Sequence, residues 1–461
     1  MSLALLIDFG STFTKILAVD LGSEEILAYA QSGTTVATDI MVGLGKALDL
    51  LPPHLKNARY ECKLSSSSAA GGLAMVTIGL VPELSAEAAR RAALGAGAKV
   101  VKVYSFRLSQ KELKELETLS PDILLLAGGS DGGNSEIILE NARILAQSAL
   151  PCPILIAGNK AAADEVNSIL SSSGKGTIIT DNVMPEVNVL NVEPARQKIR
   201  QVFIDRIIEA KGLKRAEQFV EGILMPTPTA VLNAARLLSA GVAGEPGMGD
   251  ILIVDVGGAT TDVHSVGAGN PLQAGVIRKG LPEPMAKRTV EGDLGLRYNA
   301  ETILKLCGRE KILKHARASH ADIAASVAAL SRSVETVPGS EEERDLDFAL
   351  AACAARTAME RHAGTIETLW GPQGQYYVQY GKDLTGFENL IGTGGIFIHH
   401  PEAGDILART LYSPEEPFSL RPRDPAIYTD ARYCLYAVGL LAERYPEKAF
   451  RIGKKYLKKW N

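Results

Sequence analysis

The chain has 461 residues, 22% of them charged, with a formal net charge of −4 and a sequence pI near 6.1. This length exceeds what one hydrophobic core usually serves, so two or more domains are expected. The lack of a large basic field argues against a nucleic-acid partner, and no membrane span is expected because no stretch reaches about 18 consecutive apolar residues.

The cysteines and the amino terminus favour a cytoplasmic location. Five cysteines are scattered without a C-x-x-C pair or metal-ligand spacing, which is typical of ordinary buried thiols in a reducing compartment. No positively charged region precedes the first apolar run, and Asp8 interrupts that run after a few residues. A signal peptide is therefore not expected.

The chain begins with a strand–turn–strand pattern whose first strand ends in an acid. Strands are expected over residues 4–8, 14–20 and 26–31, followed by a helix over 36–51 that stops at two prolines. The first turn combines glycine with hydroxyls, in Gly10, Ser11 and Thr12. Asp8 ends the first strand, and Lys15 lies seven residues later on the returning strand.

From about residue 69 the pattern changes to short apolar strands that alternate with amphipathic helices. Strands are expected over 73–78, 100–103, 122–127, 154–157 and 177–179, and helices over 85–95, 110–119, 134–149 and 160–171. This βαβ rhythm predicts a parallel, doubly wound layer. We interpret it as a subdomain inserted into a first lobe at about 69–180.

The most glycine-dense stretch, residues 127–134, follows one of these strands and opens a helix. Such a loop could bind an anion at the helix N-terminus. Alternatively, it could be a flexible turn in which Asn134 or a neighbour caps the helix. The stretch lacks the Gly-Lys-Ser/Thr ending of a P-loop, so a P-loop is excluded. The anion site and the flexible turn both stay open.

A helical connection leads to a second strand–turn–strand pattern of the same design. A helix is expected over 194–212, a rigid turn over 226–228, a helix over 230–240 and a glycine-rich linker over 241–249 that marks a lobe boundary. The strand that follows ends in Asp255. Its turn again combines glycines with hydroxyls, in Gly257, Gly258, Thr260 and Thr261.

Later elements complete the second half. A strand over 274–279, a loop over 291–297, a helix over 345–366 and a strand over 376–380 are expected. We expect a local Asp293–Arg297 pair to hold the loop, and contact of its acid, glycines and base with substrate or nucleotide is the alternative. The last segment, 447–460, is basic and amphipathic, and we expect a solvated helix that packs one apolar stripe on its own domain. Docking to an acidic partner or an anionic surface is the alternative.

A third glycine-containing element follows an apolar strand late in the chain. Gly392, Gly394 and Gly395 would form the floor of a nucleoside pocket, because any side chain there would occupy the space of the base. His399 and His400 come next. We expect them at a solvent-facing helix start, with metal or base contact as the less favoured alternative.

The two hairpins suggest a polyphosphate site, since facing hairpins can point backbone N–H groups at one ligand from both sides. Asp8 and Asp255 would reach one Mg²⁺, which typically takes one or two carboxylates plus phosphate oxygens and waters. Lys15 would approach the β- and γ-phosphates. Either acid could orient the attacking water, since phosphoryl transfer is mostly positioning and charge neutralisation. The hydroxyls that can donate to phosphate oxygens are those of Thr12, Thr14, Thr260 and Thr261.

In order and spacing, the three elements resemble the phosphate-1, phosphate-2 and adenosine motifs of the actin, sugar-kinase and heat-shock-chaperone ATPase superfamily. The resemblance implies an α/β, two-lobed, actin-like (ribonuclease H-like) ATPase fold that binds ATP and Mg²⁺. It also implies a first lobe over 1–240, with the inserted subdomain, and a second lobe over 250–461. The helix over 230–240 would be part of the interlobe hinge.

With residues 225–228, the same motifs make the chain similar to the accessory proteins of glutamate mutase (methylaspartate mutase), the MutL/GlmL family. The resemblance runs nearly end to end. It implies an ATP-dependent, chaperone-like factor that reactivates an adenosylcobalamin-dependent carbon-skeleton mutase by releasing damaged cobalamin. The mutase would be its partner, and the oligomeric state stays open.

Two alternatives from other classes remain. A small-molecule kinase of the same superfamily would need a further acid to deprotonate a substrate hydroxyl, and Asp262, Asp293 or Asp20 could serve. A non-catalytic scaffold would bind nucleotide without turning it over. Phosphate release without any small acceptor would separate the chaperone from both.

Overall fold

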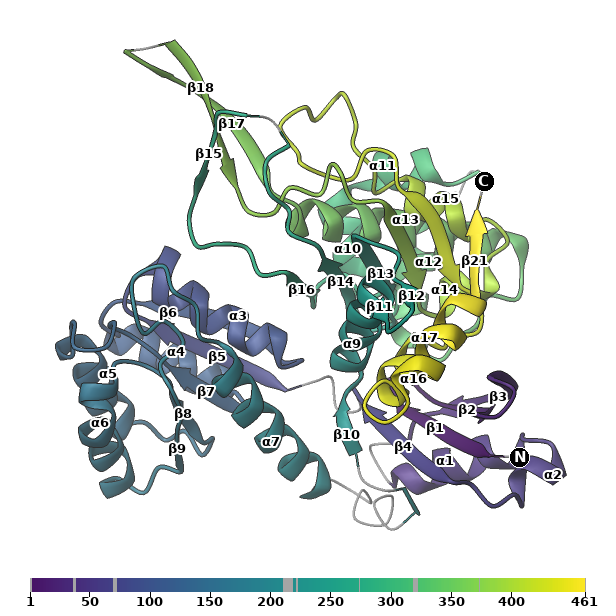
Figure 1. The fold of residues 1–461 in the computed structure, drawn as a ribbon, viewed down its shortest axis with the longest axis horizontal. Helices are drawn as coiled ribbons and strands as arrows, with labels where there is room; N and C mark the ends of the chain where they lie inside the picture. Colours follow the sequence, from purple (N-terminus) through teal and green to yellow (C-terminus); the bar gives the residue numbers. More distant parts are fainter. Residues whose placement is uncertain are drawn as a thin grey trace. The chain divides into compact units, whose positions relative to one another are not determined.

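The computed structural model describes residues 2–35, 39–68, 73–209, 219–220, 223–272, 274–317, 322–372 and 374–460. The chain forms two compact units (Figure 1). The main unit comprises Met1–Ala69, Glu209–Lys279 and Glu283–Asn461, and the inserted unit comprises Ala70–Ile208 with Gly280–Pro282. Across the residues described, none of the helices is long and apolar enough to span a membrane.

The main unit contains two sheets with the same topology, and we call the parts built on them the first and second lobes. The first sheet has the order β3-β2-β1-β4-β10, with bounds Glu25–Gly33, Phe13–Asp20, Leu3–Phe9, Cys62–Ser67 and Ile223–Pro226. The second has the order β16-β14-β13-β19-β20-β21, with bounds Ala286–Glu291, Thr261–Val266, Ile251–Val256, Asn389–Thr393, Ala426–Asp430 and Leu457–Trp460. In both, the first strand pairs antiparallel with the second and parallel with the fourth. This repetition confirms the predicted two-lobed α/β fold.

The central strands are buried on both faces, which explains their continuous apolar runs. Every residue of β1 is buried, and so is nearly every residue of β13. Helix α1, Ile40–Asp49, follows the first sheet and begins where the Asp39 side chain accepts a hydrogen bond from the Met41 amide. Residues 36–38, where this helix was predicted to begin, lie outside the described residues. The short helix α2 covers Pro53–Lys56.

Two helices cross between the lobes. Helix α9, Thr227–Ala240, follows β10 of the first lobe but packs on β13 and β14 of the second. Helix α16, Leu435–Leu441, follows β20 of the second lobe but packs on β1 and β4 of the first. The two touch where Gly439 meets Ala230, and a Cβ on Gly439 would lie 1.8 Å from the Ala230 carbonyl oxygen.

The predicted turn over 226–228 is the first turn of α9. Helix α9 starts at Thr227, three residues before the predicted start, with Pro226 as its N-cap residue. The N–H groups in the first turn of a helix have no intrahelical partner. Proline, which lacks an N–H group, therefore breaks no hydrogen bond there. The linker that follows forms a small hairpin of β11, Gly241–Val242, and β12, Glu245–Pro246.

The second lobe also carries a helical layer and a three-stranded arm. Its helices are α10 (Ala300–Cys307), α11 (Arg309–His315), α12 (Ile323–Arg332), α13 (Glu341–His362), α14 (Gly395–His399) and α15 (Ala403–Ala408). The arm has the strand order β15-β18-β17, with bounds Val276–Lys279, Gly374–Tyr380 and Thr365–Gly371. Helix α13 starts before the predicted residue 345 because Ser340 and Glu343 form a capping box.

The carboxyl-terminal segment is a helix followed by a strand. Helix α17 covers Pro446–Lys455, and β21, Leu457–Trp460, pairs with β20, so the predicted helix over 447–460 is wrong in its last residues. The helix buries an apolar stripe, as expected. Its Arg451 pairs with Glu24 of the first lobe at 2.6 Å, and the helix also contacts α9 and α16.

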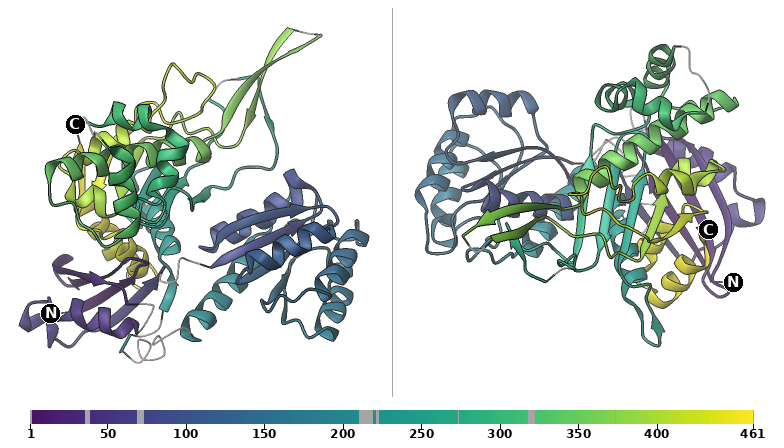
Figure 2. Two further views of the ribbon diagram at one scale, coloured as in Figure 1. Left: turned by 180° about the vertical axis from the view of Figure 1, so that it is seen from behind. Right: turned by 90° about the horizontal axis from the view of Figure 1, so that it is seen from above.

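The inserted unit has five parallel strands in the order β6-β5-β7-β8-β9, which confirms the predicted parallel layer. Their bounds are Lys99–Ser105, Ala74–Gly79, Ile123–Leu126, Ile154–Ile156 and Thr177–Ile179. The helices are η1 (Pro82–Ala86, a π-helix), α3 (Glu87–Gly95), α4 (Gln110–Leu119), α5 (Glu136–Ala146), α6 (Lys160–Ser172) and α7 (Glu193–Glu209). Helices lie on both faces of the sheet (Figure 2), and the unit extends beyond the predicted limit at 180 through α7.

The glycine-dense loop of the inserted unit is held in place by two asparagines. Asn159 accepts a hydrogen bond from the Gly132 amide at 3.1 Å and donates one to the Gly133 carbonyl at 3.1 Å. Asn182 donates to the Gly129 carbonyl at 3.0 Å. The loop is therefore an internally bonded turn and not a flexible one.

The close contact between the crossing helices leads to a stability prediction. We expect Gly439→Ala to destabilise the protein by about 1–3 kcal/mol, because the new methyl group overlaps the Ala230 carbonyl. Gly45→Ala in α1 is the matched control, since a Cβ there meets nothing within 4 Å and removing a helical glycine gains up to ~1 kcal/mol. Thermal unfolding measures both. A Gly439→Ala variant as stable as the parent protein would contradict this packing.

Candidate functional site

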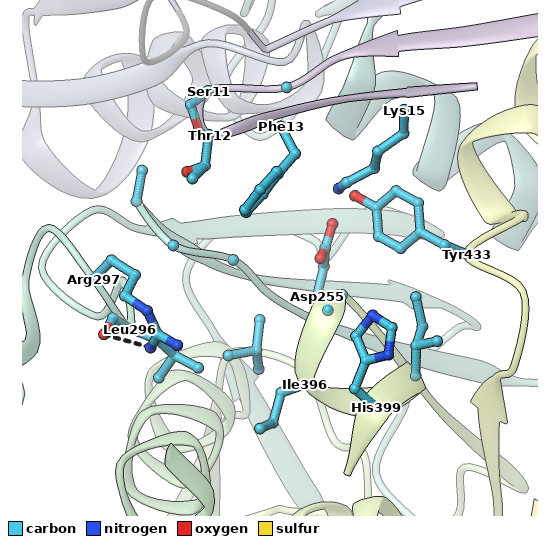
Figure 3. A pocket seen from close by; sticks show the side chains of 18 of the residues that line it. Ser11, Thr12, Phe13, Lys15, Asp255, Leu296, Arg297, Ile396, His399 and Tyr433 are labelled. Carbon is cyan, nitrogen blue, oxygen red and sulfur yellow. Dashed lines mark hydrogen bonds between the residues drawn. The ribbon is translucent and has the colours of Figure 1, made fainter. Parts of the chain in front are cut away.

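A cleft of about 550 Å³ lies between the lobes, at the point where both hairpins turn. Asp255, Lys15 and Tyr433 point into the same part of it, and Arg297 lies on its other side (Figure 3). The predicted site residues that line this cleft are Asp8, Gly10, Ser11, Thr12, Lys15, Asp255, Gly257, Gly258, Thr260, Gly394 and Gly395. The structure thus brings residues from the start, middle and last third of the chain together.

Three predicted site residues lie outside the cleft lining. Thr14 is buried with its hydroxyl 3.1 Å from that of Thr34, and Thr261 donates to the Leu294 carbonyl at 2.7 Å. A Cβ on Gly392 would lie 2.6 Å from the Phe397 ring. Alternation along the strands turns both threonines to the core face, and Gly392 makes room for Phe397, not for a base.

The two hairpin turns have the same backbone design. In the first, the Gly10 amide donates to the Phe13 carbonyl at 3.1 Å, and in the second the Gly257 amide donates to the Thr260 carbonyl at 2.9 Å. The turns approach closely, since a Cβ on Gly258 would lie 3.0 Å from the Thr12 hydroxyl oxygen. That hydroxyl is buried and has no hydrogen-bond partner in the described part of the chain.

Asp8 is fixed at the end of β1 by three neighbours. Its carboxylate accepts hydrogen bonds from Thr227 at 2.6 Å and from Ser66 at 3.4 Å, and it lies 3.8 Å from the Lys15 ammonium. Burial raises the pKa of Asp8, and the Lys15 charge opposes this rise. Lys15 is largely buried, which lowers its pKa against the attraction of Asp8 and Asp255, and it stacks 3.5 Å from the centre of the Tyr433 ring.

Asp255 occupies the corresponding place in the second lobe. Burial, followed by the nearby charge of Asp262, raises the pKa of Asp255 to about 7. Asp262 itself is paired with the buried Arg288, at 2.7 and 3.0 Å. The repulsion between the carboxylates is therefore felt mainly by Asp255, and a cation in the cleft would relieve this repulsion.

These residues fit a Mg²⁺-bound nucleotide. In the described residues there is no cluster of three or more His, Cys, Asp or Glu side chains that could hold a metal ion alone. Two carboxylates with phosphate oxygens and waters are the usual Mg²⁺ environment, and Asp8 and Asp255 supply the two. The Thr12 hydroxyl, which has no partner among the described residues, and backbone amides of the glycine turns can donate hydrogen bonds to phosphate oxygens.

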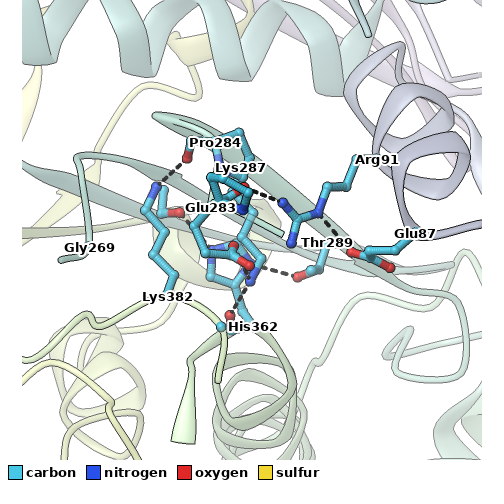
Figure 4. Close-up of polar contacts among 12 residues, drawn as sticks. Glu87, Arg91, Gly269, Glu283, Pro284, Lys287, Thr289, His362 and Lys382 are labelled. Atoms are coloured by element: carbon cyan, nitrogen blue, oxygen red, sulfur yellow. Dashed lines mark hydrogen bonds and ion pairs between the residues drawn. The ribbon is translucent and has the colours of Figure 1, made fainter. Parts of the chain in front are cut away.

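The second hairpin is supported from behind by a buried histidine. The His362 ring lies 2.9 Å from the Ser265 hydroxyl of β14 and 2.8 Å from the Thr289 hydroxyl of β16. The Lys287 ammonium donates to the His362 carbonyl at 2.9 Å (Figure 4). The end of α13 is thereby bonded to both strands, which fixes the hairpin that carries Asp255.

Sequence reasoning named Arg297 as a residue that could reach the nucleotide but preferred the wrong partner for it. Arg297 forms two hydrogen bonds with Asp347 of α13, at 2.9 and 2.6 Å, and not the predicted local pair with Asp293. Asp293 pairs instead with Arg361 at 2.8 Å. Only the fold reveals these partners, because each pair joins residues distant in sequence. Thr227 had a local signal in its flanking prolines, and Tyr433 is among the other cleft residues that were missed.

The two adjacent histidines end a helix and do not start one, contrary to expectation. They lie at the carboxyl end of α14. His399 is exposed and lines the cleft, whereas His400 is half-buried and stacks on Phe348 with ring centres 5.1 Å apart.

The acids considered for a kinase are engaged elsewhere. Asp262 lines the cleft but is bound to Arg288. Asp20 accepts hydrogen bonds from the Gly22 amide at 2.9 Å and from Ser23 at 3.2 Å, and Asp293 is paired with Arg361. Neither Asp20 nor Asp293 lines the cleft, so these three offer no unengaged base.

Comparison with known proteins identifies close relatives by sequence. A family model described as MutL protein matches residues 4–457. Protein MutL of Clostridium tetanomorphum is 50% identical over 461 residues, covering 100% of both chains.

Similarity to solved structures is much weaker. The activator of the 2-hydroxyisocaproyl-CoA dehydratase from Clostridium difficile with bound ADPNP is 10% identical, with 98% of this chain and 96% of that chain covered and a TM-score of 0.30. Plasmodium falciparum glycerol kinase with ADP is 11% identical, with 96% and 90% covered and a TM-score of 0.34. Such scores add nothing to what the sheet topology shows.

The raised pKa of Asp255 leads to a prediction about stability and pH. In the absence of Mg²⁺ and nucleotide, folded Asp255 keeps its proton up to about pH 7, whereas in the unfolded chain it loses the proton near 3.8. Folding stability therefore falls as pH rises between these values. The full difference corresponds to about 4 kcal/mol, which water in the open cleft reduces to ~1–2 kcal/mol.

We therefore expect Asp255→Asn to be more stable than the parent protein above pH 7 and equally stable near pH 4, as measured by thermal unfolding. Asp20→Asn is the control with the opposite sign, because the Gly22 amide lowers the pKa of Asp20. The Asp20→Asn variant should therefore be less stable than the parent protein at neutral pH, and this difference should vanish at low pH. A pH-independent effect of Asp255→Asn would show that the carboxyl group is not protonated in the folded protein.

Proposed function

Because the chain belongs to the MutL protein family, we propose that it is an ATP-hydrolysing, chaperone-like factor that reactivates an adenosylcobalamin-dependent carbon-skeleton mutase such as glutamate mutase. The nucleotide part of this proposal rests on one observation, the convergence of Asp8, Lys15 and Asp255 in a cleft between two sheets of the same topology. The mutase part rests on the resemblance of the sequence.

In this proposal the phosphates lie between the two hairpin turns, and the nucleoside lies toward Gly394 and Gly395. The Gly10 and Gly257 amides close the turns themselves, so other backbone amides of the turns and the Thr12 hydroxyl donate to the phosphate oxygens. Arg297, fixed by Asp347, forms the wall on the far side of the cleft. Mg²⁺ held by Asp8 and Asp255 would neutralise phosphate charge.

The two acids have different roles. Asp8 is held by Thr227, Ser66 and Lys15, so its carboxylate is fixed before any ligand arrives. Asp255 lies opposite Asp262, and its raised pKa in the absence of a cation would fall when Mg²⁺ binds beside it. Asp255 would therefore orient the attacking water as a carboxylate, while Asp8 and Lys15 position the phosphates.

Coupling to the mutase would use the movement of the lobes. A nucleotide that contacts both hairpins favours a closed arrangement, and phosphate release removes that preference. The crossing helices α9 and α16 join the lobes, so they are the expected hinge. A difference in affinity for the mutase between the closed and open states would release the damaged cofactor.

Hydrolysis is tested with two cleft variants. We expect Asp8→Asn and Asp255→Asn each to lower kcat for Mg-ATP hydrolysis by about 100-fold or more, because each removes a charge that positions metal or water. Asp293→Asn, which changes an acid outside the cleft, should retain parental activity. Phosphate release without a small acceptor supports the ATPase, whereas strict dependence on an acceptor would favour the kinase. Parental activity in both cleft variants would place the site elsewhere.

Association with the mutase is tested separately by pull-down. We expect the protein to bind purified glutamate mutase loaded with damaged cobalamin, with at least a tenfold difference in Kd, about 1.4 kcal/mol, between the nonhydrolysable-ATP and ADP states. Asp255→Asn should reduce this difference without abolishing binding. Absence of binding in every nucleotide state would exclude the reactivating role while leaving the ATPase intact.

A further inference from the structure

Two of the cysteines meet in the helical layer of the second lobe. Cys307 is the last residue of α10, and Cys353 lies in the middle of α13. The Cys307 sulfur lies 3.8 Å from the Thr357 hydroxyl, and the thiols of Cys307 and Cys353 are close enough for each to shift the pKa of the other. Cys353 and Thr357 are four residues apart on one helix, so they share a face, and Cys307 packs against that face.

We propose that Cys307 and Cys353 are a reversible thiol–disulfide pair, in which Cys307 attacks a low-molecular-weight disulfide and Cys353 resolves the mixed disulfide. The pair is formed by two packed helices and not by a C-x-x-C motif, so the sequence alone does not reveal it. Neither cysteine lines the nucleotide cleft, and the inference therefore does not depend on the proposed function.

The surroundings assign different roles to the two sulfurs. The hydrogen bond from Cys353 lowers the pKa of Cys307, with smaller contributions from Thr357 and the Lys311 charge. The same hydrogen bond raises the pKa of Cys353. Cys307 is also half-buried, whereas Cys353 is 3% exposed. A partly accessible thiolate is the attacking group in thiol–disulfide exchange, so Cys307 acts first.

The backbone around Cys307 allows the bond to form. A disulfide needs an S–S distance of about 2 Å, so the two sulfurs must move closer than their present contact. Gly308 follows Cys307 directly with a φ of +79°, and a Cβ there would meet nothing within 4 Å. The turn that follows Cys307 is therefore a glycine in the left-handed region with no side chain packed against it.

The exchange is balanced without any metal or enzyme. The Cys307 thiolate attacks one sulfur of the small disulfide, forms a mixed disulfide and releases one small thiolate. Cys353 then loses its proton and attacks the Cys307 sulfur, and the second small thiolate leaves. Two protein thiols are oxidised and one small disulfide is reduced to two thiols.

The bond would tie α10 to α13 and close the segment between them, which contains α11 and α12. Cross-linking a long segment stabilises a fold mainly by restricting its unfolded chain. We therefore expect the oxidised protein to have a higher Tm than the reduced protein, and a reducing agent to reverse the increase.

The test uses the full chain, reduced and then incubated with glutathione disulfide, followed by peptide mapping without reduction. A linked Cys307–Cys353 peptide lighter by two hydrogens is the expected product, together with the reversible increase in Tm. Cys152→Ser, which changes a buried cysteine of the inserted unit, should still form the link.

Two further variants separate the roles of the sulfurs. Cys353→Ser should trap glutathione on Cys307, and Cys307→Ser should form neither the link nor the adduct. If Cys353→Ser does not fold, Cys307→Ser at its half-exposed helix end still tests the proposal. Failure to find the linked peptide in the parent protein, or the same increase in Tm in Cys307→Ser, would overturn it.

Discussion

The rest of the main unit depends on holding two carboxyl groups at the inner ends of its central strands. Asp8 and Asp255 are the penultimate residues of β1 and β13, where burial raises the pKa of both. Such placement is unfavourable in the protein alone, because desolvation penalises the charged forms. It is the arrangement expected of a site that is completed by a cation.

The two lobes repeat one topology but neutralise their acids differently. In the first hairpin Lys15 lies opposite Asp8, and in the second Asp262 lies opposite Asp255. The first lobe thus provides its own countercharge within the cleft. The second adds another acid at the equivalent place and compensates it with Arg288 of the neighbouring strand β16. The duplicated framework therefore produces one acid that is already paired and one, Asp255, that is not.

Both hairpins and the parallel layer of the inserted unit could be predicted from sequence, because strand periodicity and glycine turns are local signals. The face of each residue was harder to predict. Thr14 and Thr261 adjoin cleft residues but face the core, since each is displaced by one position along a strand. Gly392 lies two residues before the first cleft glycine of its loop and packs against the Phe397 ring. The partners of Arg297 and Cys307 could not be predicted at all, because α13 brings Asp347 and Cys353 to them through tertiary packing.

The crossing helices determine which motions of the lobes are possible. Each helix begins on one sheet and packs on the other, so the lobes cannot separate without pulling α9 or α16 from a buried core. The contact of Gly439 with the Ala230 carbonyl leaves no room for a side chain between the helices, and packed interiors deform little. Any movement of the lobes about the cleft would therefore be a small rotation or sliding at this crossing. Thr227, which begins α9 and bonds to Asp8, would link such a movement to the site.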